Sequence, residues 1–178
     1  MQKISLVADA SALVSLASVS LLSLVLSEFS VVVSDVVVHE LKEMSTYADT
    51  SANAASEVLR NIDRITVKKA SNYQRLKTSR IDAGEASCLE IIESGEQDYL
   101  LTDDFRALGE IEKQIGEKVV LSPIILKVMV IRGRMDKRQA LTKLDEMAEK
   151  RDWLGRPIYR YARKYFEDLK SYQNKKEK

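Results

Sequence analysis

Short apolar runs alternate along the chain with longer segments in which apolar residues recur at helical spacing. Buried strands are short and continuously apolar, whereas helices need more than about ten residues. Strands that alternate with helices imply a parallel sheet with helices on both faces. We therefore predict an α/β fold whose parallel sheet has four or five strands, at residues 4–8, 31–33, 65–67, 99–102 and 119–121.

The helices are predicted from the same spacing together with signals at their ends. Asp35 is expected to cap one helix, and Asp82 with Glu85 forms a capping-box pattern at the start of another. Gly95 and Gly116 indicate where two helices end. The predicted helical segments lie between 12 and 29, at 36–44, 50–61, 82–93 and 103–115, and, in a helical carboxyl terminus, at 123–132, 136–150 and 157–172.

The composition is that of one globular domain, with 45% hydrophobic and 31% charged residues among 178. We expect a single domain over residues 1–172, with its carboxyl-terminal helices from about residue 123, and a flexible basic tail at 173–178. The only cysteine, Cys88, cannot form an internal disulfide, which predicts a cytoplasmic protein. One cysteine and one histidine also exclude a Cys/His zinc site, so any metal would be held by oxygen.

The apolar stretch at residues 12–26 resembles a signal peptide or a membrane span. It is 15 residues long and contains four serines, whereas a spanning helix needs about 20 residues. We therefore predict a buried helix pair and no membrane partner. This stretch and the apolar segment 124–131 look too extensive for one small domain to bury, which predicts a symmetric homodimer.

The net charge of +1 hides an uneven distribution of charge. Residues 150–178 hold ten Lys or Arg against four Asp or Glu, whereas residues 1–149 hold eighteen against twenty-three. A second basic stretch, at 64–80, contains no acid. An acidic body with two basic zones suits a polyanionic partner.

Carboxylates follow two of the predicted strands. Asp9 ends the first strand, and Asp103 and Asp104 end the strand at 99–102. Parallel sheets bind ligands beyond the carboxyl ends of their strands. Carboxylates about 4 Å apart repel each other by about 4 kcal/mol at an effective dielectric near 20, so they need cations or raised pKa values. With oxygen ligands only, the natural cation is Mg²⁺ or Mn²⁺. The candidate acids are Asp9, Glu40, Asp82, Glu85, Asp103 and Asp104.

Most of these acids also have a purely structural interpretation. The pair Asp82 and Glu85 can act only as a capping box, the acids after residue 102 can cap a helix, and Glu40 can lie in solvent. Asp9 is harder to dismiss, because an acid against a buried strand is costly without a partner. His39 fits a surface residue better than a catalytic base, and as the only histidine it excludes a Ser–His–Asp arrangement.

Four segments together resemble a known family. LVADAS, VVVHELKE, IDAGEASCLEII and YLLTDDFRAL, in this order over most of residues 4–133, resemble a PIN-domain protein of the VapC-like ribonuclease type. The segment RGRMDKRQALTKLDEMAEKRDWL resembles the helical end of the branch that carries a Gly-Glu motif. Two departures are the missing proline before the Glu40 helix and Ser122-Pro123 in place of Gly-Thr.

The resemblance implies a three-layer α/β/α sandwich with an acidic Mg²⁺ or Mn²⁺ pocket. It further implies a metal-dependent endoribonuclease that hydrolyses RNA phosphodiester bonds. Such a protein is often the toxin partnered by a small antitoxin protein, and is commonly a homodimer. By motif, Asp9, Glu40, Glu85 and Asp103 correspond to catalytic metal ligands, Asp104 to a second catalytic acid, and Ser11, Asp82 and Thr102 to polar residues that support them.

Two other functions compete with this one. A PIN-like RNA-binding or scaffold protein would have little catalysis, and retention of every expected acid argues against it. A response-regulator receiver would need a lysine at a late strand end, where the chain has Ser122-Pro123. Because the basic stretch immediately precedes the Asp82 motif, we expect its cations to line the approach of RNA: Lys68, Lys69, Arg75, Lys77 and Arg80, with Arg64 before them.

Overall fold

The computed structural model describes residues 3–167, without the side chains of residues 165 and 167. The chain divides into two compact units, Met1–Leu121 and Ser122–Lys178. The first unit is an α/β sandwich and the second is helical, so the predicted fold class is confirmed. The single-domain assignment stays a prediction, and the predicted tail at 173–178 lies outside the described residues.

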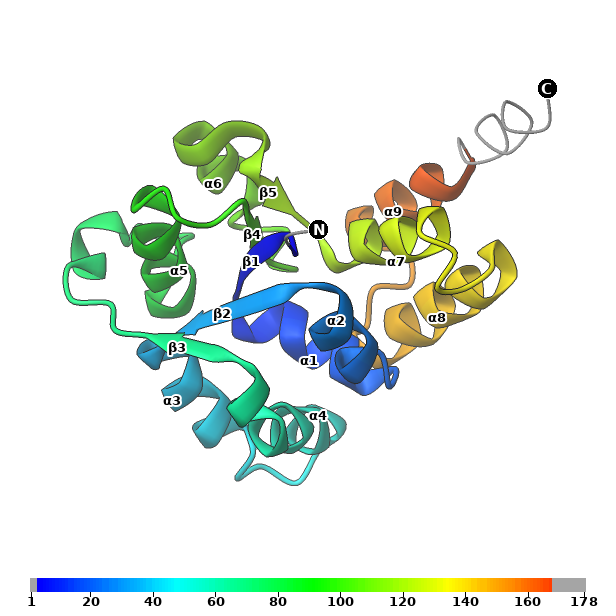
Figure 1. Ribbon diagram of the computed structural model, residues 1–178, viewed down its shortest axis with the longest axis horizontal. Coiled ribbons are helices and arrows are strands. Elements are labelled where there is room, and N and C mark those ends of the chain that lie inside the picture. Colours follow the sequence, from blue (N-terminus) through cyan, green and yellow to red (C-terminus); the bar gives the residue numbers. More distant parts are fainter. Residues whose placement is uncertain (1–2, 168–178) are drawn as a thin grey trace. The chain divides into compact units, whose positions relative to one another are not determined.

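The sheet of the first unit has five parallel strands in the order β3-β2-β1-β4-β5 (Figure 1). Its central strands are apolar and buried, as a sheet covered on both faces requires. In register, Val7 pairs with Val32 on one side and with Leu100 on the other. The strands are β1 (Ser5–Ala8), β2 (Ser30–Ser34), β3 (Thr66–Lys68), β4 (Tyr99–Leu101) and β5 (Val119–Val120).

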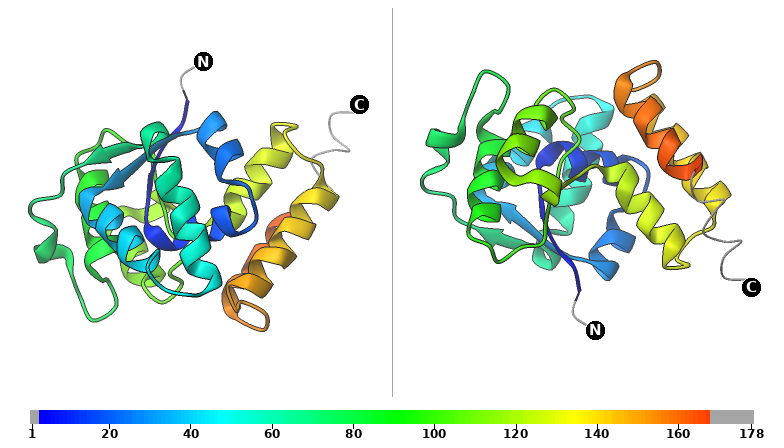
Figure 2. Two further views of the ribbon diagram at one scale, coloured as in Figure 1. Left: turned by 90° about the horizontal axis from the view of Figure 1, so that it is seen from below. Right: turned by 90° about the horizontal axis from the view of Figure 1, so that it is seen from above.

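Helices cover both faces of this sheet. Right-handed crossovers put the helices between β1, β2 and β3 on one face and those between β3, β4 and β5 on the other. The two views of Figure 2 look onto these opposite faces. The first face carries α1 (Ala10–Ser18), α2 (Leu22–Glu28), α3 (Asp35–Met44) and α4 (Thr50–Arg60), and the second carries α5 (Ala83–Glu93) and α6 (Leu108–Ile115).

The second unit consists of α7 (Ser122–Ile131), α8 (Lys137–Lys150) and α9 (Pro157–Glu167), which pack on one another. Met147 of α8 accepts a hydrogen bond from Ser122 of α7. Trp153, in the turn between α8 and α9, is buried.

Two predicted helix starts are wrong, for local reasons. Asp35 does not cap α3, because the hydroxyl of Ser34 accepts the Val37 N–H and Asp35 is the first helical residue. The helix expected from residue 103 begins only at Leu108. Asp104 accepts the N–H groups of the residues two and three positions ahead, and this Asx-type turn holds the backbone out of helix.

The apolar stretch at 12–26 forms the expected buried helix pair, α1 and α2. Leu13, Leu16, Leu22 and Val25 are at most 1% exposed. The surplus of apolar surface on which the homodimer was predicted is therefore absent from this stretch, and the homodimer stays a prediction. Within residues 3–167 no single helix is long and apolar enough to span a membrane, although the bent pair α1 and α2 passes by length and composition.

A buried pair of hydroxyls ties α3 to α5. Ser34 and Ser87 are fully buried with their Oγ atoms 2.6 Å apart. Ser87 donates its proton to the Gly84 carbonyl, so Ser34 must be the donor to Ser87. The same Ser34 oxygen caps α3. The start of α3 is thereby fixed to the first turn of α5, and each of these helices carries a candidate acid.

We predict that Ser34→Ala lowers the free energy of unfolding by about 2 kcal/mol, from about 1 kcal/mol for the cap and about 1 kcal/mol for the buried hydrogen bond. Asp49 is the matched control, because it caps α4 with an exposed side chain. Asp49→Ala should cost only about 1 kcal/mol. Urea unfolding measures both, and equal losses would contradict a structural role for the hydroxyl pair.

Candidate active site

Asp9 follows β1 at the point where the strand order reverses. The chain moves from β1 outward to β2 and β3, then returns to β4 and β5 on the other side of β1. In open parallel sheets such a switch point forms a crevice beyond the strand ends. Ala8 pairs with Leu101, which places Asp9 beside Thr102 at this crevice.

The Asp9 carboxylate is buried and receives several hydrogen bonds. Its Oδ1 accepts the Ala12 N–H at 2.9 Å and so caps α1. Its Oδ2 accepts the Thr102 hydroxyl at 2.6 Å, and the Ser11 hydroxyl lies 2.9 Å from both oxygens. These donors partly replace the water that the carboxylate loses on burial.

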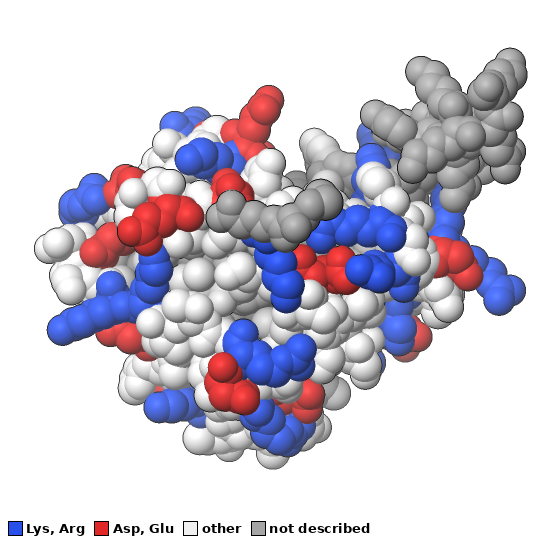
Figure 3. All heavy atoms as spheres, in the orientation of Figure 1, with Lys and Arg blue, Asp and Glu red and all other residues white. Residues whose placement is uncertain are grey.

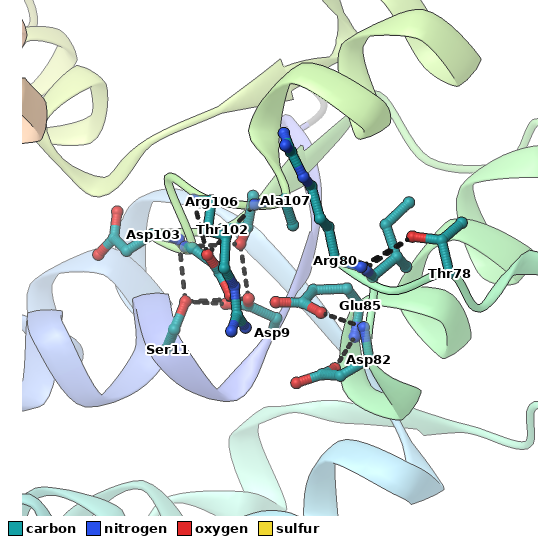
Figure 4. A network of polar contacts seen from close by, with 12 residues as sticks. Asp9, Ser11, Thr78, Arg80, Asp82, Glu85, Thr102, Asp103, Arg106 and Ala107 are labelled. Atoms are coloured by element: carbon teal, nitrogen blue, oxygen red, sulfur yellow. Dashed lines mark hydrogen bonds and ion pairs between the residues drawn. The ribbon is translucent and has the colours of Figure 1, made fainter.

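The two hydroxyls also position the segment after β4 (Figure 4). Ser11 accepts the N–H of Asp103, and Thr102 accepts the N–H of Asp104. Because each hydroxyl oxygen receives an N–H, each hydroxyl proton is directed to Asp9. The backbone at Asp103 and Asp104 is thus held in place by the same two hydroxyls that bind the Asp9 carboxylate.

Asp82 and Glu85 form the predicted capping box at the start of α5, which confirms that interpretation. Glu85 N–H binds the Asp82 carboxylate at 3.1 Å, and Asp82 N–H binds the Glu85 carboxylate at 2.7 Å. Asp82 is exposed whereas Glu85 is only 4% exposed. Capping and site membership are compatible, because the buried Glu85 carboxylate also interacts electrostatically with Asp9.

Glu40 reaches the same place from α3. A Cβ atom on Gly84 would lie 2.6 Å from the Glu40 Oε2, which real contacts essentially never show. Glycine at 84 is therefore what lets the Glu40 carboxylate approach the start of α5. Beside it lies an open hollow of about 250 Å³, lined by Val36, His39, Glu40, Glu43, Asp82, Ala83 and Gly84.

The two acids after β4 point in different directions. Asp104 accepts hydrogen bonds from the Arg106 guanidinium and interacts with Glu85, whereas the Asp103 side chain extends away from Asp9 (Figure 4). Asp103 is nevertheless buried and raises the pKa of Asp9 by its charge. Both belong to the cluster, and Asp104 interacts with Glu85 of α5.

Burial and mutual repulsion keep protons on this cluster. Burial raises the pKa of Asp9 to about 7, with repulsion from Asp103 adding to it. Burial, then repulsion from Asp82 and Asp9, raises the pKa of Glu40 to about 7. Burial and the adjacent Asp82 carboxyl raise the pKa of Glu85 to about 10. Burial also acts on Asp104, but hydrogen bonds from Arg106 and Ala107 outweigh it and lower the Asp104 pKa.

The donor set suits a hard divalent cation, although the side chains are not preassembled around one. The clustered donors are carboxylates and hydroxyls without nitrogen or thiolate ligands, as Mg²⁺ and Mn²⁺ prefer. Among the described residues no three acidic, His or Cys side chains stand at metal-binding geometry. Binding would therefore require side-chain movement, for which the exposed Asp82 and the half-buried Glu40 have room.

Other candidates lie outside the cluster. His39 is exposed and pairs with Glu43, as expected of a surface histidine, and Cys88 is buried in the core.

The sequence analysis did not single out Gly84 and Arg106, although the motif letters AGE and DDFR contain both. Of the predicted RNA-binding set, Lys68, Arg75 and Arg80 pair with Glu96, Glu93 and Glu110, and the role of the set stays a prediction.

Fold and site together define a class of protein: an α/β protein with helices on both faces of a parallel sheet and a carboxylate cluster where the strand order reverses. The chain belongs to the DUF3368 family, described as a PIN domain, which matches residues 5–168. PIN domains are typically nucleases and generally use divalent metal ions. A comparison with curated proteins finds no match to the chain. The family match leaves the roles of individual acids as predictions.

We predict that the metal-free protein loses stability as the pH rises from about 4 to about 7. The folded pKa of Asp9 lies above its unfolded value of 3.8, so the folded state holds the extra proton in this window and unfolding releases it. The stabilisation is complete below pH 4 and is lost as the pH passes 7. Asp9→Asn should remove a contribution on the order of 4 kcal/mol from this pH dependence.

Thermal or urea unfolding in EDTA across pH 4–8 measures this difference between wild type and variant. Asp49→Asn, at the exposed cap of α4, is the control and should follow the wild-type slope. An Asp9→Asn slope identical to that of the wild type would contradict a protonated, buried Asp9.

Proposed function

We propose that the chain is a Mg²⁺- or Mn²⁺-dependent endoribonuclease of the VapC-like PIN type. The observation that carries the proposal is that acids from four separate segments gather at one place: Thr102 bonds Asp9 next to Asp103, and Glu40 lies against Gly84 at the start of the helix that carries Glu85. Burial raises the pKa values of Asp9, Glu40 and Glu85, and repulsion within the cluster adds to it. A site that concentrates negative charge in this way is stabilised by a cation.

In this proposal Asp9, Glu40, Glu85 and Asp103 would hold the cation. The cation would activate water and neutralise charge on the phosphate oxygens. Asp104 or Asp82 would orient the attacking water by accepting its hydrogen bond. Ser11 and Thr102 would keep the Asp9 oxygens oriented through the hydroxyls described above.

The proposed localisation, oligomeric state and protein partner follow from the family resemblance rather than from the geometry of the site. We propose a cytoplasmic homodimeric toxin that is held inactive by a small antitoxin protein. An acidic pocket could be inhibited by a basic segment of such a partner, since charge complementarity favours that contact. A small DNA-binding protein encoded next to this gene, which co-purifies with the chain and blocks cleavage, would support the proposal.

A second function has one observation in its favour. The lack of three preassembled metal ligands among the described side chains, together with the complete capping box, suits a PIN-like RNA-binding or scaffold protein. Metal-dependent cleavage of labelled single-stranded and structured RNA separates the two functions. Cleavage by the wild type that is absent from Asp9→Asn supports the enzyme, and RNA binding without cleavage supports the scaffold.

We predict that Mn²⁺ stabilises the wild-type protein by about 2.7 kcal/mol at a hundredfold excess over Kd. Asp103→Asn should melt at or above the wild-type temperature in EDTA, because it relieves repulsion, yet gain much less from Mn²⁺ and lose cleavage. Asp104→Asn is the matched control, with the same charge change one residue away. Equal Mn²⁺ stabilisation of wild type and Asp103→Asn would overturn Asp103 as a ligand, and a loss confined to Asp104→Asn would assign that role to Asp104.

We also predict that Gly84→Ala abolishes most of the Mn²⁺ stabilisation while the fold persists. The new methyl group displaces the end of the flexible Glu40 side chain rather than backbone. Gly109 is a close control, because it too is the second residue of a helix and has no atom within 4 Å of a built Cβ. Gly109→Ala should gain up to about 1 kcal/mol of stability and keep the Mn²⁺ response.

Thermal melts of both glycine variants with and without Mn²⁺ decide this prediction. An unchanged Mn²⁺ response in Gly84→Ala would mean that Glu40 does not need its close approach to α5 to serve the site.

A further inference from the structure

The two units carry opposite net charge. Residues 1–121 hold twelve Lys or Arg against nineteen Asp or Glu, whereas residues 122–178 hold sixteen against eight. Single-stranded nucleic acid is attracted mainly through its phosphates. An acidic unit that contains a carboxylate cluster repels those phosphates, so the attraction has to arise elsewhere on the chain.

The basic stretch at 64–80 is partly engaged within the first unit. Lys68, Arg75 and Arg80 each pair with a glutamate, whereas the described residues offer no ion-pair partner to Lys69 or Lys77. Over the face of the first unit seen in Figure 3, blue and red side chains lie next to one another. Paired charges of this kind present little net potential to a phosphate chain.

Helix α9 carries its cations differently. From Trp153 to Phe166 the chain has four Lys or Arg and no acid. At about 100° per residue, the three cations within α9 fall within an arc of about 100° on one side of the helix, and Arg156 directly precedes the helix. The opposite side packs inward through Ile158, Ala162 and Phe166. The stripe, here named the α9 basic face, consists of Arg156, Arg160, Arg163 and Lys164.

Two of these cations have no ion pair among the described residues, and the other two are held in exposed or half-exposed ion pairs that a phosphate can replace. The part of the chain that the structure describes offers no ion-pair partner to Arg160 or Lys164. Arg156 pairs with Asp152 through largely exposed side chains, and Arg163 pairs with Asp145 through side chains that are about half exposed. Exposed ion pairs are worth at most about 1 kcal/mol, and a phosphate can replace the carboxylate.

An aromatic ring stands beside the stripe. Tyr161 is 54% exposed and lies one residue from Arg160 and three from Lys164 on the same helix. Single-strand binding proteins combine a cationic track for the backbone with aromatic rings on which bases stack. Successive cations at i, i+4 spacing stand about 6 Å apart along the axis, which suits successive phosphates of an extended strand.

We propose that the α9 basic face, with Tyr161 at its edge, is the surface that binds single-stranded RNA. The inference rests on the proposed function and names the surface that retains its substrate. Because both units belong to one chain, RNA held on α9 is tethered to the unit that carries the acidic cluster, which raises its effective concentration for that unit. The acidic unit can then act on a substrate that its own charge repels.

Three triple variants, each losing three positive charges, test the proposal. They are Arg156→Gln/Arg160→Gln/Lys164→Gln on α9, Lys137→Gln/Arg138→Gln/Lys143→Gln on α8, and Lys68→Gln/Lys69→Gln/Lys77→Gln in the first unit. Arg163 is left in place because its bond to Asp145 joins α9 to α8, and it also bonds Tyr159 on its own helix. Circular dichroism checks that each variant is folded.

Binding of a labelled 20-nucleotide oligouridine is measured by anisotropy in EDTA, so that no cleavage occurs, over a range of salt concentrations. The α9 variant should lower the slope of log Kd against log salt by about 2, at about 0.7 per lost contact. The other two triples should change it by much less. Tyr161→Ala should weaken binding about fivefold to a hundredfold with little change in slope.

The outcomes separate this inference from the proposed function. Equal slopes for the α9 and α8 triples, or a loss confined to the 68–77 triple, overturn the α9 surface even if metal-dependent cleavage is present. An α9-dependent slope in a protein that never cleaves RNA upholds the surface and rejects the nuclease. Vesicles with 30% phosphatidylserine form a further arm, and α9-dependent vesicle binding with unchanged RNA binding would replace RNA by a membrane surface.

Discussion

The organisation of the first unit depends on the buried carboxylate of Asp9 at the end of β1. Its burial is costly, and the cost is offset by donors that come from both sides of the strand end: the Ala12 N–H and Ser11 hydroxyl from α1, and the Thr102 hydroxyl after β4. These donors can meet only if β1 and β4 are neighbours in the observed register. Topology and site are therefore linked through one charged group.

The other acids of the cluster are each held by a local backbone requirement. Glu85 completes a capping box, Asp104 closes a turn, and Glu40 is brought to α5 by the Ser34–Ser87 hydroxyl pair and the missing side chain of Gly84. A cluster of like charges would disperse if its members were free to move. Here the helix ends and turns that need these side chains keep them together, so the capping and chemical interpretations support each other.

Sequence periodicity predicted the structural elements that depend on local patterns. It did not predict features that depend on contacts between residues far apart in the sequence. All five strands and the capping box were predicted, because short apolar runs and the spacing of Asp82 and Glu85 are local signals. The burial of residues 12–26 was also predicted, from the length and apolar composition of that stretch. The close approach of Glu40 to Gly84 was not, because it depends on how α3 and α5 pack. The ion pairs of residues 68–80 join positions 18 to 30 residues apart, which no local pattern reveals.

The charge of the molecule poses one physical problem with two parts. A pocket that attracts a divalent cation must concentrate carboxylates, and here burial, with repulsion between the acids adding to it, raises the pKa values of Asp9 and Glu40 to about 7. The same potential opposes a phosphate backbone. Within one chain the two requirements can be met only by separating them in space, with carboxylates concentrated at the switch point of the sheet and cations displayed where acids are absent. The sequence from Trp153 to Phe166 is such a region, because its inward residues are apolar and none of its residues is acidic.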